Sequence, residues 1–207
     1  MTRSIEIGRL LRGSTSGFVA GCRVPNFEAD APSLGALVRA PLGGEMQIYG
    51  LITDIHIDDD GLVRQLVTAE GVDEAAIADN RQNRTVPVEI SVLAVGYRQD
   101  GQIAHMLPPR PPLSLDIITL CDDEELRRFT SAGRFGYFRH VLRGSDLPVS
   151  EILAAHIQQA HRAHTAAGNP GWAELASQEL ITLLRDDYPA LIAVLGALGD
   201  AIGDFRF

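Results

Sequence analysis

The hydrophobic pattern of this chain changes its period once, near residue 120. Before that point, apolar residues recur two positions apart in short runs, as in Gln47–Ile57, where Tyr49, Leu51, Ile55 and Ile57 fall on one side with Thr53 as the only polar exception. After it, apolar residues recur three and four positions apart, as in the run that begins at Trp172. A period of two indicates β-strands, whereas a period near 3.6 indicates amphipathic helices. The sequence therefore predicts an α+β fold, with a β-rich part followed by a helical part.

The β-rich part contains about six predicted strands, which are separated by turn signals such as Gly13–Gly17, Asp58–Gly61 and Gln99–Gly101. The run 62–68 is a candidate hairpin partner for the strand before it. Six short strands with little helix between them are typical of a small closed antiparallel barrel. The predicted strands lie near residues 5–7, 18–24, 36–38, 47–57, 85–97 and 102–106.

The helical part begins with the acidic run Asp122–Glu125, which favours a helix N-terminus through the helix dipole. Pro148 precedes a second predicted helix over 151–164. Asn169 and Pro170 resemble the cap and first turn of a third helix, and a further helix follows Pro189. We therefore expect a barrel domain over 1–118 and a helical domain over 119–207.

A proline-rich segment, LPPRPPLSLDIITL, occupies Leu107–Leu120. Four prolines around one arginine are typical of an extended ligand for a proline-binding domain, and also of a connector between folded units. Because the segment lies where the hydrophobic period changes, the sequence favours a connector between the barrel and the helices.

Composition excludes several functions. All 18 basic residues are arginines, and both a P-loop and Schiff-base chemistry need a lysine. The net charge of −9 opposes general binding to a phosphate backbone. No apolar stretch has the length of a signal sequence or a membrane span, so we expect a cytoplasmic protein without membrane contact. No cofactor is predicted.

Two loops suggest a ligand site but lack the residues that the chemistry needs. If Gly61 is aligned with the glycine of a calcium loop, His56 and Val67 take the positions of the two anchoring carboxylates. The loop Gly13–Gly17 could hold an anion, but no lysine and no helix follow it. Plain turns are the favoured interpretation of both.

Histidine and cysteine spacing does not indicate a metal site. On the helix predicted over 151–164, only His161 and His164 are close neighbours, and His156 lies apart from them. No carboxylate stands where a zinc-binding helix would need one. Cys22 and Cys121 are far apart, so we expect two small buried residues rather than a disulfide or zinc ligands.

The segment RRFTSAGRFGYFRHVLRG, Arg127–Gly144, combines arginines with aromatic residues and contains no acid. Three interpretations remain open. The aromatic residues form a core while the arginines pair with Asp122–Glu125, or the segment is a protein interface, or it stacks and neutralises nucleic acid. The candidate interface residues are Arg127, Arg128, Arg134, Phe135, Tyr137, Phe138, Arg139 and Arg143.

The motifs IEIGRLLRGSTSGFVA, QIYGLITDI, VPVEISVLAVGY and LPPRPPLSLDIITL occur in this order and together cover about residues 4–120. In that order they resemble the HAS-barrel, the small N-terminal β-barrel of HerA-type DNA-translocating ATPases and of ATP synthase subunits. The similarity is closest to the HerA branch, where a proline pair leads from the last long strand towards the ATPase core.

The resemblance implies barrels assembled side by side on a ring and, in HerA, a docking surface for a nuclease. It implies no ATP hydrolysis here, because the roughly 87 residues after Leu120 are helical in pattern and lack a lysine. We therefore expect a non-enzymatic assembly or adaptor protein that binds itself or a protein partner, such as a HerA-like ATPase or nuclease. The alternative is a nucleic-acid-binding barrel. An unrecognised hydrolase is a third hypothesis, although no sequence pattern pairs a nucleophile with a general base.

Overall fold

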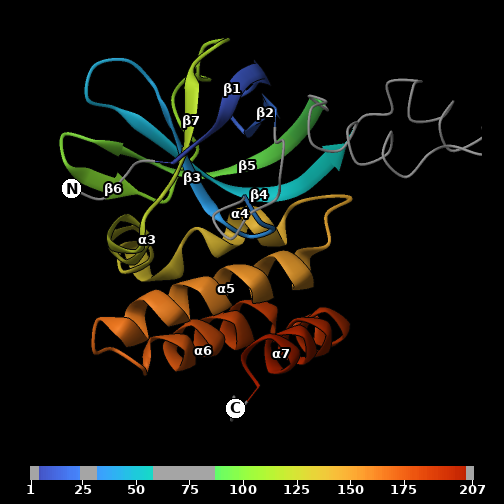
Figure 1. The fold of residues 1–207 in the computed structure, drawn as a ribbon. Coiled ribbons are helices and arrows are strands. Elements are labelled where there is room, and N and C mark those ends of the chain that lie inside the picture. The colour runs from blue at the N-terminus through green and yellow to red at the C-terminus, as the bar shows by residue number, and fades with distance from the viewer. Residues whose placement is uncertain (1–4, 24–31, 58–86, 204–207) are drawn as a thin grey trace, which may run out of the picture.

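Seven β-strands form an antiparallel sheet that closes on itself. The computed structural model of the protein describes residues 5–23, 32–57 and 87–203. Within them, the sheet order is β2-β1-β7-β3-β4-β5-β6, and β5 pairs back onto β2. Six strands thus close a barrel, and β6 extends from β5 as a hairpin (Figure 1). The strands are β1 (Ile5–Gly13), β2 (Gly17–Arg23), β3 (Leu37–Pro41), β4 (Gln47–Ile57), β5 (Pro87–Gln99), β6 (Gln102–Ala104) and β7 (Ile117–Leu120).

This architecture confirms the predicted α+β fold with its closed six-stranded barrel. The strands expected at 47–57 and 85–97 correspond to β4 and β5, and the short strand expected at 36–38 corresponds to β3. The predicted turn at 58–61 and the hairpin candidate at 62–68 lie outside the described residues.

The proline segment lies within the barrel, which corrects its interpretation as the connector to the helices. It leads from β6 to β7, and β7 then pairs with both β1 and β3. Pro108 and Pro112 are buried, and the Arg110 guanidinium donates to the backbone oxygen of Leu42 at 2.6 Å. The chain leaves the barrel only after Leu120, so β7 spans the expected boundary at residue 118.

Five α-helices follow the barrel: α3 (Asp123–Thr130), α4 (Phe138–Leu142), α5 (Val149–Ala166), α6 (Trp172–Leu184) and α7 (Tyr188–Ile202). The Asp122 side chain caps α3 by accepting from the Glu125 amide at 2.8 Å. Asn169 does not cap α6, because that helix begins after Gly171. The backbone N–H of Asn169 instead donates to the backbone oxygen of His164 at the end of α5. Among the described residues, no helix is both long and apolar enough to cross a membrane.

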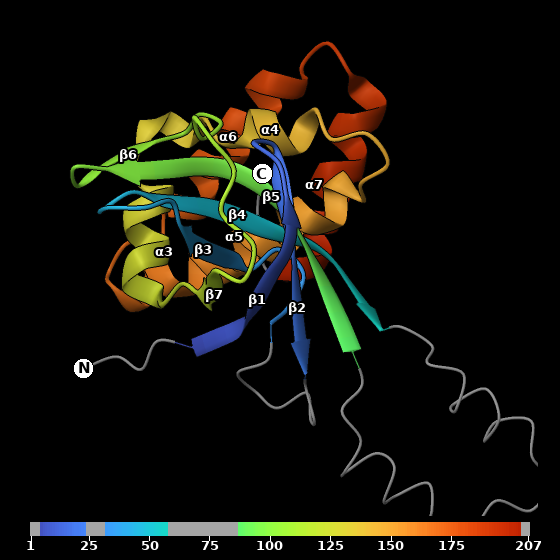
Figure 2. The same cartoon turned by 90° about the horizontal axis from the view of Figure 1, so that it is seen from above.

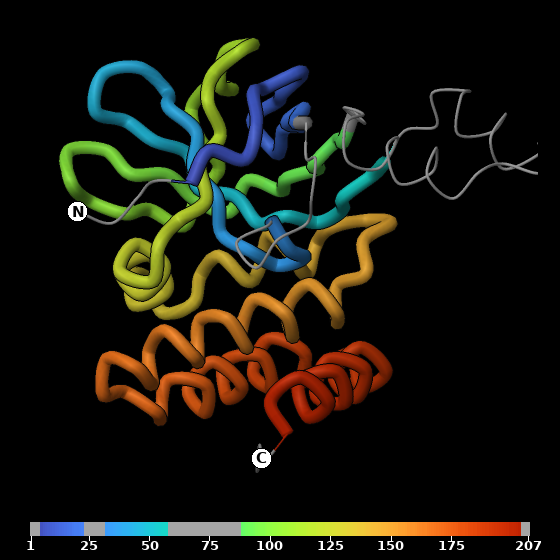
Figure 3. Tube along the Cα trace, in the orientation of Figure 1, coloured from blue at the N-terminus to red at the C-terminus, as the bar shows by residue number. Residues whose placement is uncertain are grey.

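The helices cover one side of the barrel, with α3, α4 and α5 next to it and α6 and α7 beyond (Figures 1 and 3). Seen from above, the helices project past the sheet on the side of α4 and α7 (Figure 2). Strand β4 connects the two layers because its alternate side chains face opposite ways. Ile48 and Ile52 belong to the core inside the barrel, whereas Tyr49 and Leu51 join the core formed with the helices. The barrel and the helices therefore share one of the two cores.

Candidate interaction surface

The arginine and aromatic segment 127–144 folds into three short pieces. It includes the end of α3, a single 3₁₀ turn at Gly133–Phe135 and the helix α4. None of these pieces is long enough to be stable alone, so contacts with the rest of the molecule must hold the segment in place.

Aromatic packing supplies most of these contacts. Phe129, Tyr137 and Phe138 are each 0% exposed. The Tyr137 ring lies 4.7 Å from Phe138 and 5.2 Å from Phe129, and Phe129 lies 4.9 Å from Tyr49 of the barrel, measured between ring centroids. Phe135 is half-buried. The core interpretation therefore holds for the aromatic residues, and Tyr137 and Phe138 offer no surface to a partner.

The turn between α3 and α4 is left-handed. Gly133, Arg134 and Phe135 have φ angles of 56°, 47° and 56°, a region that costs a residue with a β-carbon about 1–2 kcal/mol. Packing offsets part of this cost for Phe135, whose ring stacks on Phe138 at 5.5 Å and lies 5.5 Å from Trp172. No such contact compensates Arg134, which is exposed.

The backbone of His105 ties α4 to the end of the β5–β6 hairpin. The guanidinium of Arg139 donates to the His105 oxygen, and the Nε2–H of His140 donates to the same oxygen at 3.2 Å. The buried His105 ring donates through Nε2 to the Phe129 oxygen at 3.1 Å. A β-carbon at Gly133 would lie 2.8 Å from His105 Nδ1, so the turn needs glycine at this position.

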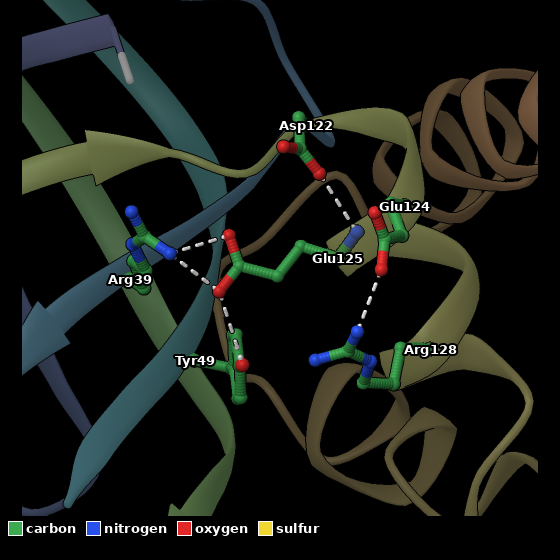
Figure 4. Close-up of polar contacts among 6 residues, drawn as sticks. All are labelled: Arg39, Tyr49, Asp122, Glu124, Glu125 and Arg128. Carbon is green, nitrogen blue, oxygen red and sulfur yellow. Dashed lines mark hydrogen bonds and ion pairs between the residues drawn. The ribbon is translucent and has the colours of Figure 1, made fainter. Parts of the chain in front are cut away.

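The five arginines of the segment differ in their partners. Arg127 donates to the Ala163 oxygen at 3.4 Å, and Arg128 pairs with Glu124 at 2.7 Å (Figure 4). Arg139 bonds only to the His105 oxygen, and Arg134 and Arg143 are exposed. Within the described ranges, no carboxylate lies within 4.0 Å of these last three. We call Arg134, Arg139 and Arg143 the arginine cluster.

Electrostatics within the cluster reflect this missing counter-charge. Burial is the largest cause that lowers the pKa of His140; the hydrogen bond to His105 opposes it, and the charges of Arg139 and Arg143 lower it further. Burial likewise lowers the pKa of His105, and the charge of Arg139 adds to the effect. Both guanidinium groups therefore lie close enough to His140 to repel its protonated form.

The carboxylates that the sequence offered as partners are engaged elsewhere. Glu125 bonds to Arg39 of β3 through both oxygens, at 2.6 and 2.7 Å, and accepts from the Tyr49 hydroxyl at 3.3 Å (Figure 4). Burial and the Glu125 charge raise the pKa of Tyr49, and Glu125 raises that of Arg39 against the effect of burial. Of the acidic run, only Glu124 pairs with an arginine of the segment. Glu125 instead fixes α3 to the barrel.

Two buried histidines, which sequence reasoning treated only as candidate ligands, hold the helices together. His156 donates through Nδ1 to the Gly35 oxygen and accepts from the Tyr137 hydroxyl, both at 3.0 Å. Burial lowers the pKa of His156 to about 4. His164 bonds to the Thr130 hydroxyl at 2.8 Å and stacks on Trp172. Among the described residues, no three metal-ligating side chains form a site.

The remaining candidates are structural features of the barrel. The loop Gly13–Gly17 borders a shallow, mostly apolar groove of about 380 Å³. The Ser14 hydroxyl donates within the loop to the Gly17 oxygen at 3.2 Å, and Arg12 pairs with Glu89 at 2.8 Å. Cys121 is a half-buried free thiol that packs against the core shared with the helices, and burial raises its pKa.

No protein family matches the sequence, and no curated protein matches it significantly. The resemblance to the HAS-barrel therefore stays a prediction, alongside a fold that has the closed barrel such a domain would need.

Proposed function

We propose that this protein is a non-enzymatic assembly or adaptor protein that docks on a partner protein through the arginine cluster. The observation that carries the proposal is the lack of partners for three arginines of one short stretch: Arg134 on the left-handed turn and Arg139 and Arg143 on α4 and its C-cap have no carboxylate partner among the described residues, although the whole chain has a net charge of −9.

The cluster is unfavourable for the isolated chain. Arg139 and Arg143 are four residues apart on α4 and its C-cap, a spacing at which like charges repel on a helix. Arg134 adopts a left-handed conformation without a packing contact that offsets it. Unfavourable local conformations persist mainly where function requires them. Arginine is also one of the residues enriched at the centres of protein interfaces.

A protein partner fits the cluster better than nucleic acid does. Proteins that bind single strands need aromatic rings on which bases stack, and Tyr137 and Phe138 of this segment are buried. A polyphosphate would also be repelled by the net negative charge of the chain. Nucleic acid remains the alternative, to be tested at the same surface.

The resemblance to the HAS-barrel suggests the first partners to test. They are a HerA-type ring ATPase, its nuclease and a second copy of this chain. In the first case this chain would cap or regulate the ring without hydrolysing ATP.

Affinity capture from the native cells, with light scattering on the purified chain, tests the proposal. The cluster variant is Arg134→Gln with Arg143→Gln, which leaves the bond from Arg139 to His105 intact. The control variant is Arg128→Gln with Arg185→Gln, which removes the same charge from two exposed arginines that already pair with carboxylates. We expect the wild type and the control to retain a partner that the cluster variant loses. A monomer that captures nothing, or an equal capture by all three proteins, contradicts the proposal.

A further inference from the structure

The arginine cluster comes from two consecutive pieces of the chain, the left-handed turn and α4 with its C-cap. The charges of Arg139 and Arg143 both lower the pKa of His140, which lies between them in the sequence of α4 and its C-cap. The guanidinium of Arg139 also runs back along the left-handed turn, since a β-carbon at Gly136 would lie 3.5 Å from its Nη1. Arg134 extends from that same turn two residues earlier.

The cluster has hydrogen-bond donors to spare. A guanidinium has five N–H donors, and Arg139 uses one of its terminal nitrogens to bond His105. The side chains of Arg134 and Arg143 make no hydrogen bond with the described part of the chain. Guanidinium groups bind the two oxygens of a carboxylate through paired N–H groups, which an ammonium cannot do. The surface therefore suits several carboxylates held close together.

The rest of the molecule limits the length of an anionic partner. The chain has a net charge of −9, and acidic residues lie close to the segment on α3, such as Asp123 and Glu124. A double-stranded nucleic acid carries one charge for about every 1.7 Å of its axis and would extend over these acids. A short acidic peptide places its charge only on the cluster.

We propose that the arginine cluster binds a short acidic segment of a partner protein, one with several aspartate or glutamate residues in sequence. This inference rests on the proposed function and adds the chemistry of the partner. The carboxylates pair with Arg134 on the left-handed turn and with Arg139 and Arg143 on the short helix that follows it.

An NMR titration tests this chemistry without knowledge of the partner. The probe is an octaglutamate peptide, and the readout is the Nε–Hε signal of each arginine, which detects weak binding. We expect saturable shifts at Arg134, Arg139 and Arg143 and none at Arg128 or Arg185. The cluster variant should bind about tenfold more weakly, because two exposed charge pairs are lost, and the control variant should bind like the wild type.

Two results would overturn the inference. Absent shifts, or equal shifts at Arg128 and Arg185, would show that the cluster does not select carboxylates. Tighter binding of an eight-residue single-stranded DNA at the same arginines would assign the surface to nucleic acid. If octaglutamate fails while affinity capture still depends on the cluster, the adaptor function stands and only the acidic partner is wrong.

Discussion

Arginine has two different roles at the two ends of α3. At its start, Arg39 lies against Glu125 and Tyr49 in the contact between the barrel and the helices. Beyond its end, the arginine cluster has no carboxylate within 4.0 Å among the described residues. The contacts of Arg39 stabilise the junction between the barrel and the helices. The unpaired charges of the arginine cluster, by contrast, lower the stability of the isolated chain. Charges without a partner inside the protein are available to another protein, and the following predictions test this difference between the two sites.

The largest expected effect comes from the core beneath the cluster. Phe138→Ala should lower the free energy of unfolding by about 3–5 kcal/mol, because it opens a cavity between Phe135 and Tyr137. Urea unfolding measures this loss. Leu175→Ala is the control, since Leu175 is 55% exposed and should change stability by under about 0.5 kcal/mol. Equal losses would mean that the segment is not anchored by its aromatic residues.

The second effect is a loss of stability in acid through His156. Its folded pKa of about 4 lies below the unfolded value near 6.5, so the unfolded chain binds the extra proton between these values. This contribution, about 3 kcal/mol, is fully present above pH 6.5 and is lost as pH falls towards 4. Unfolding measured across pH 4–7 should show a shallower slope for His156→Gln than for the wild type. Identical slopes would contradict the buried, neutral state of His156.

The third prediction compares two adjacent carboxylates. Glu125→Gln should cost about 2 kcal/mol, because it removes the charge that Arg39 and Tyr49 face in a partly buried site. Glu124→Gln removes the same charge from an exposed pair with Arg128 and should cost under about 0.5 kcal/mol. Thermal or urea unfolding of the two variants measures the difference. If Glu124→Gln lowered the free energy of unfolding as much as Glu125→Gln, the contact of Glu125 with Arg39 and Tyr49 would contribute no more than an exposed ion pair.

The smallest expected effect has the opposite sign. Arg134→Gly should stabilise the protein by up to about 1 kcal/mol, because glycine adopts the left-handed conformation without strain. The same variant should weaken partner capture. A fall in stability would show that the Arg134 side chain supports the fold.

The sequence predicted the regular elements well because they are periodic. Strand β4 has apolar residues at even spacing, Tyr49, Leu51 and Ile55, although both of its faces are buried from Ile48 to Thr53. The buried face of α6 repeats through Trp172, Ala176, Leu180 and Leu184. Strand β7 has only four residues after a proline run, which is too short to show a period, so the proline segment was misassigned as the connector between the barrel and the helices.

The candidate surface was only partly predictable. Composition identified Arg127–Gly144, but it could not separate arginines with partners from those without. Arg39 and Glu125 are 86 positions apart, and only the closed barrel brings them together. The left-handed turn has one sequence signal, Gly133 before Arg134 and Phe135, because glycine is the residue that most readily permits such a conformation.

Site-specific photocrosslinking in the native cells tests most directly whether the arginine cluster is a docking surface. A photoreactive residue at Ser145, which is exposed two positions after Arg143, should yield a discrete protein adduct. The same residue at exposed Thr182 of α6 should not yield this adduct, and Arg134→Gln with Arg143→Gln should abolish it. An adduct at Ser145 that persists without the two arginines, or no adduct there at all, would contradict the account.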